Sequence, residues 1–196
     1  MSVTGASRLP PIGVMGIDNR KLGMWIFLSS EVMLFAGLIG SFVNLRAANL
    51  VMMTEAAELL NRPLGAVNAL ILITSSLTMT LAVAAIKRGD RSKFKLFLSI
   101  TILLALGFLG VKAVEYGQKF SHHYTPHTNL FFSFYFIMTG LHAFHVFVGV
   151  VLLSIVLAKG SSPSSHVDPL VVENSGLYWH FVDVVWIFLF PLLYLT

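Results

Sequence analysis

The last apolar segment of the chain carries a histidine and an acid that could act together. His180 and Asp183 are three residues apart, and Trp179 and Trp186 flank them. Ionisable groups at membrane depth cost roughly 2.5–3.5 kcal/mol each to insert, so they usually have a partner or a task. Asp183 could orient the His180 ring as an acid orients a metal-bound histidine. A structural hydrogen bond near the headgroups is the simpler interpretation, and Trp179 suits an interfacial aromatic belt.

A second acid and two more histidines lie in other apolar segments. Glu31 is about nine residues into the first segment, which places it roughly 13 Å deep in a helix. A carboxyl group there is expected to be protonated or hydrogen-bonded. It could serve as a proton-relay site, or as a neutral acid that locks two helices together. The sequence leaves both roles open.

His142 and His145 are three residues apart, so they share one face of the fourth segment. Such a pair could ligate a metal or haem, but Glu31 is the only acid at similar depth. We therefore expect hydrogen bonds across helices, with a contact between Glu31 and one histidine, and no metal site.

Lys112 and Glu115 lie near the outer end of the third segment, again three residues apart. An intrahelical ion pair lowers the cost of placing both groups in the membrane. We expect this structural pair. His122, His123 and His127 cluster in the following loop. They could bind a surface metal, although a solvated loop explains them more simply.

Composition indicates a membrane protein. Hydrophobic residues make up 56% of the 196 residues, charged residues 11%, and mean hydropathy is +0.81, whereas soluble domains carry about 25% charged residues. The chain has no cysteine. Disulfides, thiolate zinc sites, iron–sulfur clusters and cysteine-ligated copper are thereby excluded. No cleavable signal peptide is evident, and no phosphate-binding glycine loop or catalytic triad is found.

Five apolar segments are long enough to cross about 30 Å of hydrocarbon as helices. The expected fold is therefore all-α: a polytopic bundle of five transmembrane helices over residues 22–196, after an N-terminal tail of residues 1–21. Ala36 with Gly40, and Gly107 with Gly110, mark expected helix contacts. The five expected spans run from about Leu22 to Leu45, Leu64 to Ile86, Leu96 to Gln118, Leu130 to Ala158, and Leu177 to Leu195.

The distribution of basic residues predicts the orientation. Nine lysines and arginines lie in the N-terminal tail and the second and fourth connections, three lie on the opposite side, and Lys112 lies inside a helix. The positive-inside rule then places the N-terminus in the cytoplasm and the C-terminus outside.

Four of these segments together resemble subunit III of the haem-copper oxidases, in its short five-helix bacterial form. The resemblance covers about residues 20–195. The first segment is similar to the family pattern W-x-F-x-x-S-E-x-x-x-F, with Glu31 as its acid. The third resembles Q-x-x-E-Y, with Lys112 in place of the usual glutamine. The fourth resembles T-G-x-H-x-x-H-V from Thr139 to Val146, and the fifth resembles Y-W-H-F-V-D-x-V-W from Tyr178 to Trp186.

The resemblance implies an accessory subunit of a proton-pumping cytochrome c oxidase in the bacterial inner membrane. Such a subunit has no catalytic residues or redox centres of its own. It stabilises subunit I, supports proton uptake and adjoins subunit II, while haem and copper belong to its partners and a bound phospholipid is compatible with it. The alternatives within the family are a quinol oxidase subunit III and a nitric-oxide-reductase accessory protein. Outside it, a stand-alone b-type cytochrome or a proton-coupled transporter stays open.

Overall fold

The computed structural model describes residues 18–121, 124–161 and 167–195. These residues form six α-helices, and five of them are long and apolar enough to cross a membrane. The spans were predicted in the right order and number, but two features differ from the prediction. The helices are α1 (Asn19–Ala48), α2 (Leu50–Glu58), α3 (Arg62–Lys87), α4 (Arg91–Ser121), α5 (Leu130–Ser161) and α6 (Pro169–Tyr194).

The first difference is the short helix α2, which the sequence analysis treated as part of a connection. It has nine residues, too few to cross a bilayer, and it buries Met53, Ala56 and Ala57. The second difference is the start of α6 at Pro169, eight residues before the expected Leu177. Glu173, Asn174 and Ser175 lower the hydropathy of its first turns, so the apolar run begins later than the helix.

Local sequence sets several helix ends. Asp168 accepts a hydrogen bond from the Leu170 amide, and Pro169 occupies the first turn of α6, where its missing N–H costs nothing. Asn61 caps α3 in the same way through the Leu64 amide. Gly89 turns the chain from α3 into α4 with φ of +76°, a left-handed conformation that favours glycine.

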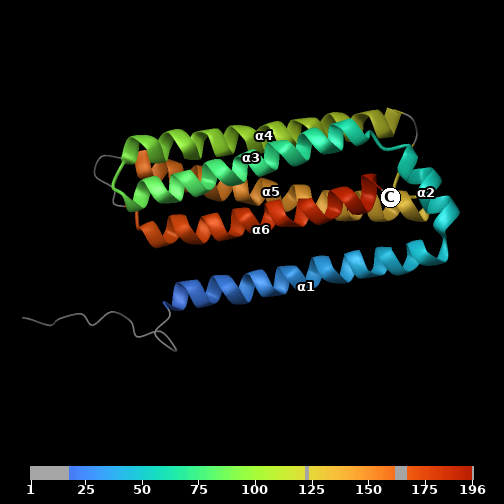
Figure 1. Ribbon diagram of the computed structural model, residues 1–196, viewed down its shortest axis with the longest axis horizontal. Helices are drawn as coiled ribbons and strands as arrows, with labels where there is room; N and C mark the ends of the chain where they lie inside the picture. Colours follow the sequence, from blue (N-terminus) through green and yellow to red (C-terminus); the bar gives the residue numbers. More distant parts are fainter. Residues whose placement is uncertain (1–17, 122–123, 162–166, 196) are drawn as a thin grey trace, which may run out of the picture.

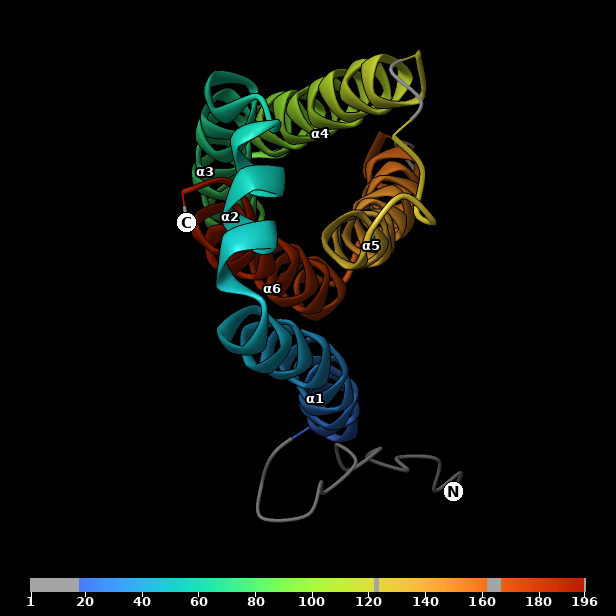
Figure 2. The same ribbon diagram turned by 90° about the vertical axis from the view of Figure 1, so that its right-hand side faces the viewer.

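Helices α3 to α6 form a closed bundle in which α3 packs on α4, α4 on α5, α5 on α6 and α6 on α3. Figure 2 looks along this bundle and shows α1 outside it, against α6, with α2 crossing one end. Figure 1 shows the start of α1 at the opposite end from the C-terminus. Helix α1 buries only Leu28, Phe35 and Phe42, a stripe with seven-residue spacing, so most of its surface faces outward.

Close helix contacts use glycines other than the expected ones. A Cβ atom on Gly149 of α5 would lie 2.7 Å from the Trp179 ring of α6, so glycine is required there. At Gly40, Gly107 and Gly110 an added Cβ would meet nothing within 4 Å. Those small-residue pairs therefore do not pack helices together within this chain.

Candidate functional site: polar clusters inside the bundle

Glu31 contacts His145 across the interface between α1 and α5. Glu31 Oε2 lies 3.0 Å from His145 Nε2, and His145 Nδ1 lies 2.8 Å from the Leu141 carbonyl oxygen. Because a carbonyl only accepts, Nδ1 carries a hydrogen. Nε2 then either accepts a proton shared with the Glu31 acid or donates to its carboxylate. The pair thus holds one proton between two helices and joins α1 to the bundle.

His142, one turn earlier on α5, does not join this contact. Its side chain is fully buried, and within the described residues neither ring nitrogen has a hydrogen-bond partner. The ring packs against Phe108 and Trp186, with centroids 5.5 and 5.2 Å away. No group of three or more His, Cys, Asp or Glu side chains that could hold a metal occurs in the described part of the chain.

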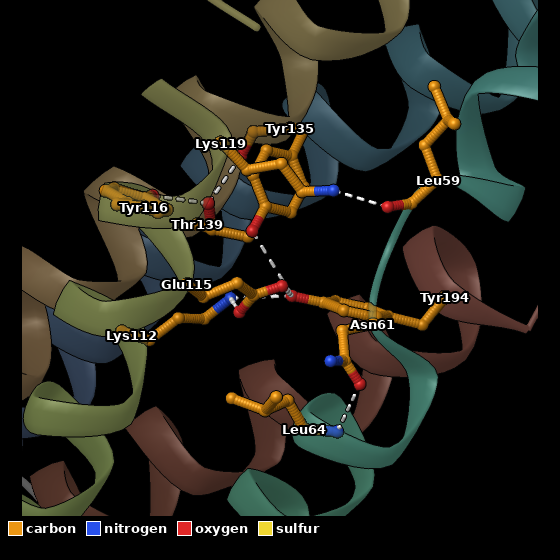
Figure 3. A network of polar contacts seen from close by, with 10 residues as sticks. All are labelled: Leu59, Asn61, Leu64, Lys112, Glu115, Tyr116, Lys119, Tyr135, Thr139 and Tyr194. Atoms are coloured by element: carbon orange, nitrogen blue, oxygen red, sulfur yellow. Dashed lines mark hydrogen bonds and ion pairs between the residues drawn. The ribbon is translucent and has the colours of Figure 1, made fainter. Parts of the chain in front are cut away.

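Lys112 and Glu115 form a buried cluster with Tyr194 of α6, seen in Figure 3. Lys112 Nζ lies 2.9 Å from Glu115 Oε2 and 2.7 Å from the Tyr194 hydroxyl. Tyr194 in turn donates to Glu115 Oε1 over 2.6 Å. The triangle uses the lysine as donor, the carboxylate as acceptor and the hydroxyl as both. Sequence spacing indicates the first contact, but not the tyrosine 79 residues away.

Aromatic rings surround the Lys112 ammonium group. It lies 4.7 Å from the Trp186 ring centroid and 5.3 Å from those of Tyr135 and Tyr194. Ring faces attract a cation at such distances, most strongly where water is excluded. The ring faces are therefore placed to stabilise a positive charge on Lys112.

A second lysine closes the same end of the bundle. Lys119 donates to the Leu59 carbonyl between α2 and α3, as Figure 3 shows. It also borders an open pocket of about 450 Å³ that Asn61, Gln118 and Tyr124 help to line. Lys119 thus ties the unpredicted helix α2 to α4. Of the neighbouring loop histidines, His127 is exposed, while His122 and His123 lie outside the described residues.

His180 and Asp183 are arranged differently from the prediction. They lie in the middle of α6, because the helix begins at Pro169, and not near its end. His180 Nδ1 lies 2.7 Å from the Ser76 hydroxyl of α3. Neither carboxyl oxygen of Asp183 has a partner among the described residues, so the expected bond between Asp183 and His180 is not formed.

The two tryptophans that flank this pair are both buried in the bundle. The proposed interfacial position of Trp179 is wrong, because its indole nitrogen donates to Ser75 Oγ over 3.1 Å inside the α3–α6 interface.

Charged side chains that the sequence analysis did not single out fasten α1 to α6 and α3. We call Arg20, Lys21, Lys87, Asp168 and Glu173 the end clamp. Arg20 contacts Asp168 at 2.6 Å, and Glu173 accepts from Lys21 at 3.0 Å and from Lys87 at 3.2 Å. A hydrogen bond from the Arg20 guanidinium, together with one from the Leu170 amide, holds the pKa of Asp168 below its usual value. In the sequence, the signal that could have revealed the end clamp is the grouping of these charged residues near the ends of the apolar segments.

Comparison with known proteins identifies this arrangement. Residues 14–196 match the family described as cytochrome c oxidase subunit III. The chain belongs to the cytochrome c oxidase subunit III family. It is 36% identical over 186 residues to cytochrome c oxidase subunit 3 of Alkalihalophilus pseudofirmus, covering 90% of this chain and 86% of that protein. It is 39% identical over 180 residues to the protein of that name from Corynebacterium diphtheriae, covering 89% and 86%.

Quinol oxidases also have members in this family. The quinol oxidase subunit 3 of Bacillus subtilis is 34% identical over 180 residues, covering 89% of this chain and 85% of that protein. Family membership makes the chain a multi-pass membrane subunit of a haem-copper oxidase, one that lacks redox centres. Family membership accounts for the histidines and Glu31 better than a stand-alone b-type cytochrome or a proton-coupled transporter does.

Proposed function

We propose that the chain acts as an accessory subunit that stabilises subunit I and supports proton uptake, with cytochrome c as the electron donor of the complex. The contact between Glu31 and His145 carries this proposal. It joins α1, which lies outside the bundle, to α5 through a shared proton, so it can hold the two helices together. No described cluster offers the ligand set of a redox centre.

Replacing Glu31 in the assembled oxidase tests this role. Gln keeps the shape and one hydrogen bond to His145, so Glu31→Gln is expected to be milder than Glu31→Ala. In both variants the initial rate of oxygen consumption stays near that of the parent, while subunit retention or activity over many turnovers falls. Glu58→Gln is a matched control, because Glu58 is an exposed acid on α2.

The measurements are the initial rate, activity through sustained turnover, and the content of each subunit. An immediate and complete loss of oxygen reduction in Glu31→Gln, with every subunit present, would place this carboxyl on the catalytic path. That result would contradict the accessory role.

The end of the bundle that carries the end clamp is proposed to face the cytoplasm. The bias of basic residues toward that end supports this orientation. Because the chain has no cysteine, Lys93→Cys and His127→Cys give clean labelling sites at opposite ends. An impermeant thiol reagent added from outside is expected to label only position 127, and labelling of both positions would contradict the orientation.

An apolar groove between α1 and α6 suits a lipid chain. Val32, Phe35, Ile39, Phe181 and Phe188 are among the side chains that line its volume of about 370 Å³. We propose that an acyl chain of a membrane phospholipid fills it. Gly40 also borders the groove, so Gly40→Leu is expected to lower the phospholipid retained by the purified complex, measured by mass spectrometry. Unchanged retention would count against a lipid there.

A quinol donor is the second candidate, favoured by the quinol oxidase subunits among the relatives. Oxidation of cytochrome c and of quinol by the purified complex separates the two.

A further inference from the structure

Asp183 is a buried acid for which the accessory role gives no task. Its side chain is 3% exposed, and within the described residues neither carboxyl oxygen has a hydrogen-bond partner. An ionised carboxylate without a partner is very costly in an apolar interior. The group therefore requires a neighbour that can give it a proton or a hydrogen bond.

Ser76 of α3 is close enough to interact with the Asp183 carboxyl group, but no hydrogen bond joins the two in this structure. The Ser76 hydroxyl instead contacts His180 Nδ1 at 2.7 Å. A serine hydroxyl has one hydrogen to donate and two lone pairs that accept. With hydrogen on Nδ1, His180 donates to Ser76, and the Ser76 hydrogen is free to turn toward Asp183. The three side chains can therefore form a chain of hydrogen bonds that runs from His180 through Ser76 to Asp183.

An open cavity with mainly apolar walls, to which Val83 and Leu177 contribute, runs from His180 toward the charged residues at one end of the bundle. It has a volume of about 190 Å³, and Thr80, Lys87, Glu173 and His180 are among the residues that line it. Thr80 Oγ1 lies 3.4 Å from His180 Nε2, on the cavity side of the ring. A volume of this size has room for a few water molecules, each of which takes about 30 Å³ in the liquid.

The mouth of the cavity is charged. Glu173 pairs there with Lys87 of α3 and with Lys21 of α1, and its carboxyl side chain is 29% exposed. Lys87 and Glu173 belong to the end clamp, so the cavity between α3 and α6 reaches the charged end of these two helices. His180 is the one titratable side chain between this mouth and Asp183 among the residues that line the cavity.

We propose that His180, Ser76 and Asp183 form a proton-exchange path, which lets the buried Asp183 carboxyl bind and release protons carried by water in this cavity. The transfer is balanced. Nε2 of the His180 ring takes a proton from a hydronium ion, which is left as neutral water, Nδ1 passes one to Ser76 Oγ, and the Ser76 hydroxyl hydrogen passes to the Asp183 carboxylate. His180 and Ser76 end neutral, and Asp183 ends as the acid. Release follows the reverse steps.

Hydrogen–deuterium exchange of the Asp183 carboxyl, measured in the assembled oxidase by infrared spectroscopy, tests the path. Asp183→Asn assigns the C=O band of the protonated acid, and transfer to heavy water then shifts that band as the proton exchanges. Ser76→Ala is expected to slow this shift by about tenfold or more, equivalent to about 1.4 kcal/mol in barrier height. Ser76→Thr keeps a hydroxyl and is expected to restore the rate.

Ser75→Ala is the matched control. Ser75 is the adjacent hydroxyl on α3, but it contacts the Leu72 carbonyl and the Trp179 indole nitrogen, so its loss is expected to leave the exchange rate unchanged. Equal exchange in Ser76→Ala and the parent would overturn the path. So would slowing by Ser75→Ala as large as that by Ser76→Ala, or the absence of an Asp183 carboxyl band at every pH at which the complex is intact.

Discussion

The buried pair of Lys112 and Glu115 gives the sharpest prediction about stability. Lys112→Met removes contacts of 2.9 Å to Glu115 and 2.7 Å to Tyr194, and leaves a carboxylate that is 1% exposed. Breaking a buried ion pair by removing one partner costs about 3–5 kcal/mol. We expect a loss of this size in Lys112→Met. Glu115→Met is expected to lie at the lower end, since the rings around Lys112 still attract its charge.

The double replacement has a different outcome. Removing both charges together ranges from neutral to stabilising, but the fully buried Tyr194 hydroxyl then loses both strong partners, which costs about 1–3 kcal/mol. The double variant is therefore expected to be destabilised by no more than about 3 kcal/mol, well below the sum of the single changes. Adding Tyr194→Phe to the double variant removes the orphaned hydroxyl and is expected to recover most of that loss.

The assay is the free energy of unfolding of the subunit in mixed detergent micelles, arranged as a double-mutant cycle. Asp90 and Lys93, at the start of α4, provide a matched control. They form another pair with the same spacing, at 3.2 Å, but 69% of the Lys93 side chain is exposed. Their cycle is expected to give about 0–1 kcal/mol. Additive effects of Lys112→Met and Glu115→Met would refute the argument.

Three further predictions concern packing, acid stability and metal content. Gly149→Ala places a Cβ atom 2.7 Å from the Trp179 ring and is expected to destabilise the subunit by about 1–3 kcal/mol; Gly110→Ala, where space is open, should cost clearly less in the same unfolding assay. The lowered pKa of Asp168 means that its contact with Arg20 stabilises the fold above its unfolded-state pKa and is lost as pH falls through the folded value. Asp168→Asn keeps a helix cap and is expected to weaken the acid dependence of unfolding below about pH 4, and an unchanged profile would exclude this ion pair as a contributor. The isolated subunit is expected to show no haem signal and no stoichiometric copper in optical spectra and metal analysis.

Hydropathy is enough to predict the five spans, because each is a long run of mostly apolar residues. It fails where a helix extends beyond the membrane. Helix α6 begins with polar turns around Glu173, and α2 is too short to produce a spanning signal. The start of α6 is set by a local cap at Asp168, which a hydropathy profile does not register. The position of α2 depends on the packing of Met53 against a partner surface that the sequence does not display.

The polar clusters show the same division between local and distant contacts. Spacing suggests that Lys112 and Glu115 meet, because both lie on one helix face. It does not reveal Tyr194, which comes from another helix. Likewise, His180 lies close in sequence to Asp183, yet its hydrogen bond goes to Ser76, 104 residues away. Helix register decides these partners, and register follows from the packing of the whole bundle.

The contact between Glu31 and His145 also bears on how the chain is made. Its two halves are 114 residues apart, and α1 leaves the ribosome long before α5 and α6, the helices on which it packs. During that interval the first helix stands in lipid with an unshared carboxyl group and few neighbours. A chain that stops before α5 keeps this group without its partner. The first helix therefore carries an acid that gains its hydrogen-bond partner only when α5 is in place.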